Sequence, residues 1–214
     1  IMPADEYGRY AIAIATLSLI HIVTFTWLEA AVARFHARAE QRGRLRDHLA
    51  TAYGLYLVIA AGAGALLVLG VNMLPLDPKL QAALGFAVIS LLLRALLQIG
   101  METHRAGGDV GRYSALEASY LMIGFMVGIG VILATDLGAA GVFIGTAVAA
   151  LIMLVFDLPV MLRRAAKGRR QKVRAASFAR YGAPVSMSLI FEHLLSVGDR
   201  FLIAALISQG AVGM

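Results

Sequence analysis

Cysteine is absent from the 214 residues, and charged residues are scarce at 15% of the chain. The lack of thiols excludes disulfides, thiolate catalysis and zinc sites built from cysteine. The charged fraction is well below the roughly 25% that soluble domains carry. In contrast, 60% of the residues are hydrophobic, and the mean hydropathy is +0.79. A water-soluble fold would have to expose several long apolar runs, so the composition predicts an integral membrane protein.

The sequence also lacks the common catalytic motifs. It has no phosphate-binding loop, no glycine-rich dinucleotide turn, no HExxH and no dense set of histidine and carboxylate ligands. We therefore expect no enzyme, no cofactor and no metal site. A membrane-embedded enzyme is the alternative we favour least, because no compact acid/base constellation occurs. His104 and Arg105, which stand beside Gly107 and Gly108, are expected to form a polar loop.

Six stretches are long and apolar enough to cross a bilayer, which takes about 20 residues of helix. They are 10–33, 51–74, 80–101, 115–135, 138–162 and 182–207. These runs are apolar on nearly every side, whereas the strands of a membrane barrel alternate between apolar and polar residues. The predicted fold class is all-α, a polytopic transmembrane helical bundle of about six spans.

The net charge of +6 comes from Lys and Arg that cluster between the apolar runs, a pattern that disfavours nucleic-acid binding. Fifteen of the nineteen basic residues fall in three alternate connections: Arg34, Arg38, Arg42, Arg44 and Arg46; Arg105 and Arg112; Arg163, Arg164, Lys167, Arg169, Arg170, Lys172, Arg174 and Arg180. Short cytoplasmic loops accumulate such residues. We therefore predict that these three loops are cytoplasmic and that both chain ends lie on the opposite side. A basic run such as 163–180 is typical of topology and of attraction to anionic lipid.

Polar residues inside the apolar stretches are the best functional evidence. An ionised side chain at the bilayer centre costs about 2.5 to 3.5 kcal/mol, so such residues face a protein interior or a wet cavity. The third stretch repeats polar residues every four positions, which places them on one helical face: Ser90, Arg94, Gln98 and Glu102. Glu117 opens the fourth stretch, and Asp157 lies near the inner end of the fifth.

Two other stretches carry polar residues as well. In the sixth they occupy neighbouring faces: Glu192, His193, Ser196, Asp199 and Arg200. In the first, helical geometry brings three residues within about a quadrant of one another: Ser18, His21 and Glu29. Because at least three helices carry a polar face, we expect them to line one hydrophilic cavity. The alternative is that these groups only pair between helices, for example Arg94 with Glu117 or Arg200 with Asp199 of a neighbour.

Small residues at a spacing of four are a further pattern: Gly124 with Gly128, and Gly141 with Gly145. This spacing lets membrane helices approach closely, and packing is the interpretation we favour over a direct function.

Two blocks of sequence suggest a family. The first is Glu6-Tyr7-Gly8-Arg9-Tyr10-Ala11 with Trp27-Leu28 and Arg34-Phe35; the second is Tyr181-Gly182-Ala183-Pro184 with Ser196, Asp199-Arg200-Phe201-Leu202-Ile203 and Gly210-Ala211-Val212-Gly213. Together they resemble bacterial polysaccharide-export flippases of the multidrug/oligosaccharidyl-lipid/polysaccharide superfamily. The resemblance is moderately specific in these blocks and generic in the helices between them.

The resemblance implies a transporter with two helical lobes, of which this chain would supply helices two to seven. Residues 1–162 would then be the rest of the N-terminal lobe, with five spans, and 163–180 would be a basic cytoplasmic linker between the lobes. Residues 181–214 would begin the C-terminal lobe. The start at Ile1, with no visible signal peptide, also suggests a fragment.

The function implied by the resemblance is translocation of an undecaprenyl-pyrophosphate-linked oligosaccharide across the bacterial inner membrane, by alternating access. The product would be O-antigen of lipopolysaccharide, capsule or exopolysaccharide. The expected partners are the lipid-linked oligosaccharide, membrane lipids, and a polysaccharide polymerase with glycosyltransferases, and no nucleic acid. A drug or small-molecule antiporter of the same superfamily is one alternative. A membrane scaffold that recruits glycan-assembly enzymes is another.

Candidate site residues follow from charge and position. Arg94 and Arg200, with Gln98, are the expected substrate-binding residues, because guanidinium donors match phosphate geometry and keep their charge. The candidates for proton or sodium coupling, or for lining the cavity, are Glu192, Asp199, His193, His21, Glu29 and Glu117.

Overall fold

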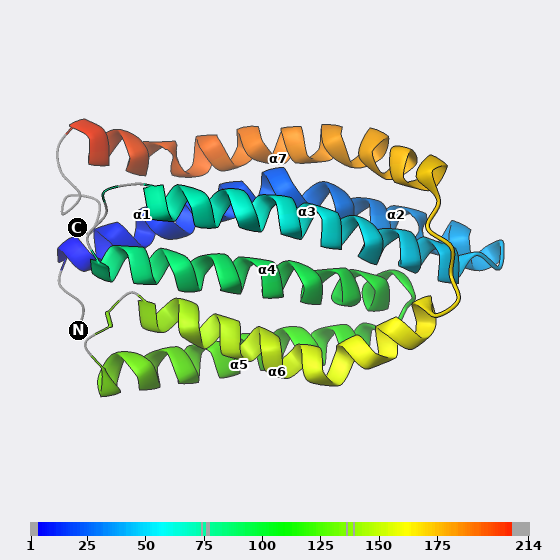
Figure 1. Cartoon of the computed structure of the whole chain (residues 1–214), viewed down its shortest axis with the longest axis horizontal. Coiled ribbons are helices and arrows are strands. Elements are labelled where there is room, and N and C mark those ends of the chain that lie inside the picture. Colours follow the sequence, from blue (N-terminus) through cyan, green and yellow to red (C-terminus); the bar gives the residue numbers. More distant parts are fainter. Residues whose placement is uncertain (1–3, 74, 76–77, 136, 139, 207–214) are drawn as a thin grey trace.

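The chain folds into a bundle of long helices (Figure 1). The structure is a computed structural model that describes residues 4–73, 75, 78–135, 137–138 and 140–206. Its elements are α1 (Ala4–His21), the π-helix η1 (Ile22–Thr26), α2 (Trp27–Gln41), α3 (Leu45–Met73), α4 (Pro78–Ala106), α5 (Val110–Ala134), α6 (Ala140–Ala165) and α7 (Lys172–Leu206). No strand occurs among the described residues. The predicted all-α class is confirmed.

The connections between the helices gather at the two ends of the bundle (Figure 1). The connections α2–α3, α4–α5 and α6–α7 lie at one end, which we call the arginine-rich end because it carries the three basic segments predicted above. The connections α3–α4 and α5–α6 lie at the opposite end, together with the start of α1 and the finish of α7. The bundle thus separates basic from weakly charged connections as the charge alternation predicts.

Five helical segments of the described chain are long and apolar enough to span a membrane: Ala13–Gln41, Leu45–Met73, Gln81–Ala106, Val110–Ala134 and Ala140–Ala165. They match the first five predicted stretches. The sixth stretch, 182–207, is helical as far as Leu206 but is not among these segments. Pro184, Glu192 and His193 make this part of α7 less apolar than the others. The chain is therefore a polytopic helical membrane protein, with five clear spans among the described residues.

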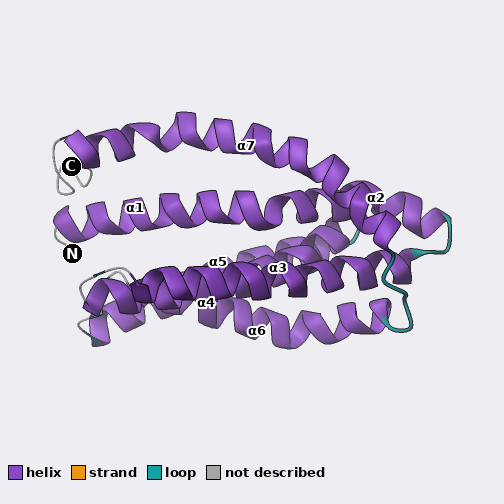
Figure 2. Cartoon of the chain, turned by 45° about the horizontal axis from the view of Figure 1, so that its top comes forward, coloured by secondary structure: helices purple, strands orange, loops and turns teal. Residues whose placement is uncertain are grey.

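The core has two clusters that meet at α4. One cluster joins η1, α2, α3 and α7 to α4 around Leu28, Leu49 and Phe178, which are fully buried. The other joins α4 to α5 and α6 around Leu97 and Met101. Figure 2 shows α1 and α7 on one side of the bundle, with α2 approaching the other helices at the arginine-rich end. Because α4 contributes to both clusters, it links the two parts of the core.

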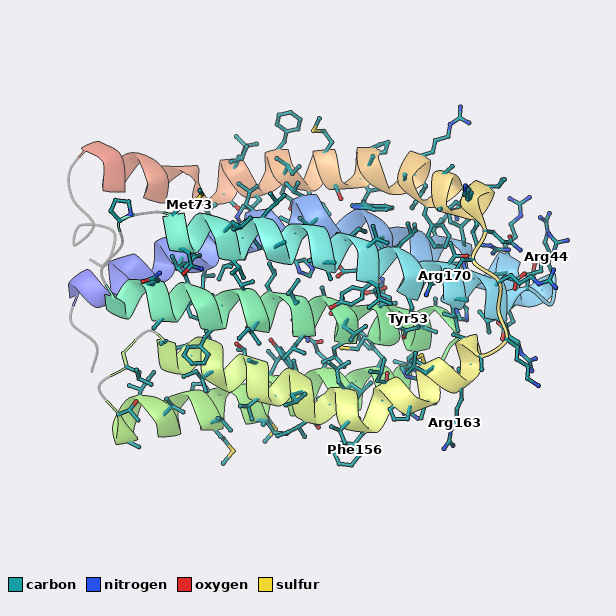
Figure 3. All side chains as sticks on the ribbon, viewed as in Figure 1. Arg44, Tyr53, Met73, Phe156, Arg163 and Arg170 are labelled. Atoms are coloured by element: carbon teal, nitrogen blue, oxygen red, sulfur yellow. The ribbon has the colours of Figure 1, made fainter. Side chains whose placement is uncertain are left out.

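Large apolar side chains point away from the bundle on the outside of several helices. Leu133 is 81% exposed, Phe156 67% and Leu195 87%, and Figure 3 shows Phe156 projecting outward from α6. Exposure of this extent on a water-soluble protein would create large apolar patches that promote aggregation. On a membrane protein the same side chains face lipid, which agrees with the apolar segments.

Glycines set the closest helix contacts. A Cβ atom at Gly145 of α6 would lie 2.5 Å from the backbone nitrogen of Gly128 in α5. The small residues at a spacing of four therefore allow α5 and α6 to pack closely, as predicted. Gly182 of α7 lies against the carbonyl group of Trp27 with no room for a Cβ atom. The ring of Tyr181 meets the ring of Phe35 edge-on, with 5.6 Å between centroids. The two sequence blocks that suggested a family therefore touch each other.

Candidate functional site: a polar cleft between the N-terminal helix and α4

A cleft of about 530 Å³ lies between the N-terminal helix, formed by α1, η1 and α2, and the group α4, α5 and α6. Its walls are Ile14, Leu17, Ser18, His21, Ile22, Glu29, Ala87, Ser90, Leu91, Arg94, Gln98, Tyr120, Val142, Phe143 and Thr146. Arg94 stands twelve residues before Ala106, which ends α4, so it lies about 18 Å from that end at 1.5 Å per residue. The cleft is thus deep within the apolar part of the bundle.

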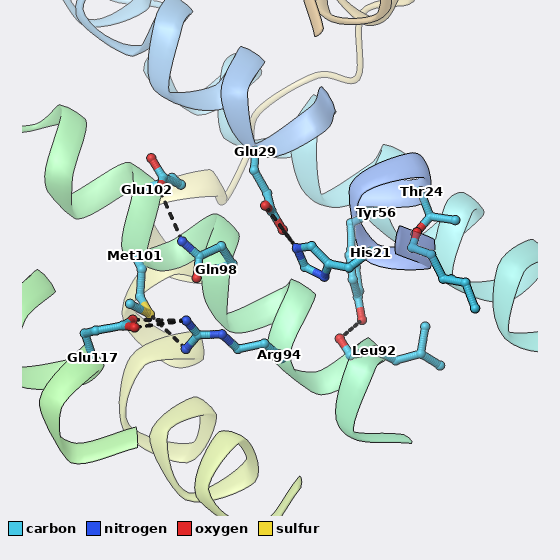
Figure 4. A network of polar contacts seen from close by, with 11 residues as sticks. His21, Thr24, Glu29, Tyr56, Leu92, Arg94, Gln98, Met101, Glu102 and Glu117 are labelled. Carbon is cyan, nitrogen blue, oxygen red and sulfur yellow. Dashed lines mark hydrogen bonds and ion pairs between the residues drawn. The ribbon is translucent and has the colours of Figure 1, made fainter. Parts of the chain in front are cut away.

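Arg94 is held by a carboxylate and an aromatic ring of α5 (Figure 4). Its Nη2 donates to Oε1 and Oε2 of Glu117, at 3.2 and 3.1 Å. Its guanidinium carbon lies 4.1 Å from the centre of the Tyr120 ring, a cation–π contact. The side chains of Arg94 and Glu117 are still 23% and 30% exposed. The structure therefore forms the Arg94–Glu117 pair considered above, and Arg94 of this pair lines the cleft.

The polar face of α4 continues from the cleft toward the arginine-rich end. The side-chain amide of Gln98 donates to Glu102, 3.1 Å away. Glu102 in turn accepts hydrogen bonds from the guanidinium of Arg105. Ser90, one turn before Arg94, shares a 2.8 Å hydrogen bond with the Thr146 hydroxyl of α6. The four-residue spacing thus places a row of polar groups along one side of α4.

His21 and Glu29 form a second pair on the facing wall (Figure 4). Nε2 of His21 lies 3.1 and 3.3 Å from the two carboxylate oxygens of Glu29. In an unbroken α-helix, residues eight apart point roughly 80° away from each other. The π-helix Ile22–Thr26 stands between them. Its wider turn rotates the chain through a smaller angle per residue than an α-helix does, which brings the two side chains together. Such π-turns are frequent at functional sites.

The predicted site residues of α7 are placed differently. The ring nitrogen Nε2 of His193 lies 3.0 Å from the carbonyl oxygen of Ala15, so His193 contacts α1. Glu192 is exposed and does not line the cleft. The side chains of Asp199 and Arg200 lie outside the described residues. The cleft therefore gathers His21, Glu29, Arg94 and Gln98 on its walls, with Glu117 bonded to Arg94, and the α7 candidates stay predictions.

A buried ionic cluster near the arginine-rich end was not predicted from the sequence. His104 is fully buried, and its Nε2 lies 2.8 Å from Oδ1 of Asp157 in α6. The same oxygen accepts from Nε and Nη2 of Arg112 in α5, at 2.9 and 2.8 Å. The expectation that His104 and Arg105 form a loop is therefore wrong, because α4 continues to Ala106.

A signal for this cluster was present in the sequence. Asp157 stands in an apolar stretch and needs a partner there. His104 follows Met101 by three residues and Leu97 by seven, which puts it on the buried face of α4. Gly100 makes the room, since a Cβ atom at this position would lie 2.6 Å from Oδ2 of Asp157.

The polar groups of the cleft suit binding and ion exchange. Over the residues that the structure describes, no group of three or more His, Asp and Glu side chains is arranged to hold a metal ion. The cleft walls offer a guanidinium, an amide, hydroxyls and the carboxylate of Glu29, and a second carboxylate, that of Glu117, is bonded to the guanidinium. No protein-family model, curated protein or solved structure matches this chain.

Proposed function

We propose that this protein takes part in translocating an undecaprenyl-pyrophosphate-linked oligosaccharide across the bacterial inner membrane, for surface polysaccharide synthesis. The observation that carries the proposal is the open polar cleft around Arg94, deep in the membrane-spanning part of the bundle. Lipid does not account for a charged cleft at this depth. The resemblance of the two sequence blocks to polysaccharide-export flippases supports the substrate class.

Arg94 is the residue we propose for contact with the pyrophosphate. A guanidinium has five N–H donors in a planar fork, and Glu117 accepts only from Nη2. Phosphate oxygens could therefore bind the remaining donors, or replace Glu117 altogether. The Tyr120 ring keeps the guanidinium plane in position during such an exchange. The lipid tail would stay in the bilayer while the glycan passes through the cleft, and no bond would be made or broken.

A neutral pair tests the role of Arg94 without leaving an unpaired buried charge. The double variant Arg94→Gln with Glu117→Gln keeps hydrogen bonding between α4 and α5 but removes the phosphate-binding cation. We expect surface glycan to fall about tenfold or more, the equivalent of one lost charge-assisted hydrogen bond. The measurement is complementation, with the full-length protein, of a bacterial strain that lacks its own lipid-linked glycan translocase.

The matched control removes an acid and a base from another part of α4. Glu102 and Arg105 form such a pair outside the cleft walls. The variant Glu102→Gln with Arg105→Gln should leave surface glycan within twofold of wild type. Immunoblots of membranes must show equal amounts of all variants. Wild-type glycan from the Arg94/Glu117 variant, at equal protein level, would refute the proposed contact.

The His21–Glu29 pair is the part of the cleft that we propose for ion coupling. A carboxylate beside an imidazole can exchange a proton. Movement of that proton would change which of the two pairs, His21–Glu29 or Arg94–Glu117, balances the charge in the cleft. Glu29→Gln keeps a hydrogen bond to His21 but cannot take up a proton.

We expect glycan export by Glu29→Gln to fall about tenfold, because the variant loses a charge-assisted bond. The residual export should no longer respond to a protonophore. Glu40, an exposed carboxylate near the end of α2, provides the control, and Glu40→Gln should behave as wild type. Unchanged protonophore sensitivity in Glu29→Gln would exclude this pair from coupling.

A small-molecule antiporter is the second candidate, since the carboxylates of Glu29, on the cleft wall, and of Glu117, bonded to Arg94, could attract an organic cation. It makes a different prediction for the same strains. Cells that express the wild-type protein would resist toxic cations such as ethidium, and the Arg94/Glu117 variant would lose that resistance while surface glycan stays unchanged.

A further inference from the structure

A second cleft, of about 270 Å³, lies at the arginine-rich end between α2 and the beginning of α7. Its walls are Phe35, Arg38, Ala39, Arg42, Arg44, Gln171, Val173, Arg174, Ser177 and Phe178. Four of these residues are arginines and none is acidic. We call it the arginine cleft. It is separate from the polar cleft around Arg94, with which it shares no residue.

The arginines of this cleft are poorly neutralised. Within the part of the chain that the structure describes, the side chains of Arg38, Arg42 and Arg44 make no ion pair and no hydrogen bond. The nearby carboxylate of Asp47 is occupied by other groups. It accepts from the backbone N–H of Arg169 and from the side-chain amide of Gln171, both at 2.8 Å.

Arg174 adds a partly desolvated charge to the same cleft. Its Nε donates to Oε1 of Gln171, 3.3 Å away, which orients the guanidinium. Burial lowers the pKa of the Arg174 guanidinium, Asp47 raises this pKa, and the charge of Arg44 lowers it. Gln171 stands directly before α7, and Val173 and Arg174 are in its first turn, where free backbone N–H groups add partial positive charge. An anion in the cleft would offset both the desolvation and the repulsion.

Apolar side chains adjoin the charges of the arginine cleft. The rings of Phe35 and Phe178 stack at the base of the cleft, with 5.9 Å between centroids and 5° between planes. Val173 is 82% exposed and Tyr181, one turn beyond Phe178, is 37% exposed. Aromatic and basic residues side by side are characteristic of the membrane–water interface, where lipid phosphates lie. Figure 3 places Arg44 at the outermost point of this end of the bundle.

We propose that the arginine cleft binds the phosphate of an anionic membrane lipid, with Arg38, Arg42 and Arg174 around the headgroup and the acyl chains along Val173 and Tyr181. Guanidinium forks match phosphate oxygens. The apolar border distinguishes a lipid phosphate from a soluble one. Such a lipid would tie the end of α2 to the start of α7. The inference is independent of the substrate proposed for the polar cleft.

Native mass spectrometry of the detergent-purified full-length protein tests this site. The probes are phosphatidylglycerol, phosphatidylethanolamine and soluble glycerol phosphate. We expect wild-type protein to retain phosphatidylglycerol in preference to phosphatidylethanolamine. The variant Arg38→Gln, Arg42→Gln, Arg174→Gln should lose about tenfold in phosphatidylglycerol affinity, and glycerol phosphate at millimolar concentration should not displace the lipid.

The control removes three charges from the same end of the molecule. Arg46, Arg163 and Arg164 line another cleft there, which also contains Glu40. Their replacement by Gln should change lipid affinity less than twofold. If both triple variants lose phosphatidylglycerol affinity equally, the basic end attracts anionic lipid in general and the proposed site is overturned. Unchanged affinity in the Arg38/Arg42/Arg174 variant would overturn it as well. Displacement by glycerol phosphate would overturn the lipid assignment.

A second variant keeps the test valid if the first triple variant misfolds. Arg42 and Arg44 are exposed, and their side chains support no packing or hydrogen bond among the described residues. Arg42→Gln with Arg44→Gln therefore leaves the fold intact and should still lower phosphatidylglycerol affinity severalfold. Wild-type affinity in this variant would contradict the proposal.

Discussion

Replacing Asp157 by alanine should lower the free energy of unfolding by about 3 to 5 kcal/mol, because it removes one partner from a buried ionic cluster. The carboxylate is 2% exposed and accepts from both His104 and Arg112. Without it, a buried imidazole and a guanidinium lose their acceptor in an apolar bundle. This cluster joins α4, α5 and α6, so its loss should loosen the wall of the polar cleft as well.

Reversible unfolding in mixed detergent micelles measures this effect. The fluorescence of the single tryptophan, Trp27, and far-ultraviolet circular dichroism report on the transition. Asp109 is the control carboxylate, because it is 46% exposed, lies 3.6 Å from the other ring nitrogen of His104 and caps α5. Asp109→Ala should cost only about 1 kcal/mol, the usual value of an N-cap. If the two variants lose equal stability, the buried cluster is not the source.

The main features of the fold could be predicted from the sequence because few physical rules decide them. Apolar length fixes where helices cross a bilayer, and alternating basic connections fix which ends lie together. The sixth stretch was harder to place because α7 mixes Glu192 and His193 with apolar residues. Hydropathy alone does not decide whether a helix of such mixed composition crosses the bilayer completely.

The candidate site was predictable where helical spacing decides it. The four-residue repeat of α4 placed Arg94 and Gln98 on one face, and both line the cleft. Contacts between helices far apart in the sequence were harder to predict. Asp157 and His104 are 53 positions apart, and periodicity gives the face of each helix but not its rotation against a neighbour.

The π-helix was also beyond prediction, although it aligns His21 with Glu29. Its sequence, Ile22-Val-Thr-Phe-Thr26, carries no established signature. One local feature accompanies it in the structure, where the Thr24 hydroxyl donates to the carbonyl oxygen of Ile20 at 2.6 Å. Such side-chain bonds compete with the helix ladder and bend helices. Whether a given threonine does so depends on the packing around it, which a single sequence does not reveal.

Replacing a glycine at the contact between α5 and α6 should also cause a large loss of stability. Gly145→Ala should destabilise the protein by about 2 to 3 kcal/mol, the cost of forcing extra volume into a packed interface. The new Cβ atom would meet the backbone of α5, 2.5 Å from the nitrogen and 2.6 Å from the Cα atom of Gly128, and backbone cannot move aside as a side chain can. The helices must therefore separate, which would also displace Thr146 and its hydrogen bond to Ser90 at the cleft.

Gly130→Ala provides a control that should not lower the stability of the protein. Gly130 is on α5, is exposed and has nothing within 4 Å of a Cβ atom. Alanine there should leave stability unchanged or raise it by about 0.5 to 1 kcal/mol, because alanine is the better helix former. The same detergent unfolding experiment compares the two variants. A Gly145→Ala protein as stable as Gly130→Ala would mean that α5 and α6 are not held in contact by their glycines. The wall of the polar cleft would then have to be positioned by side chains alone.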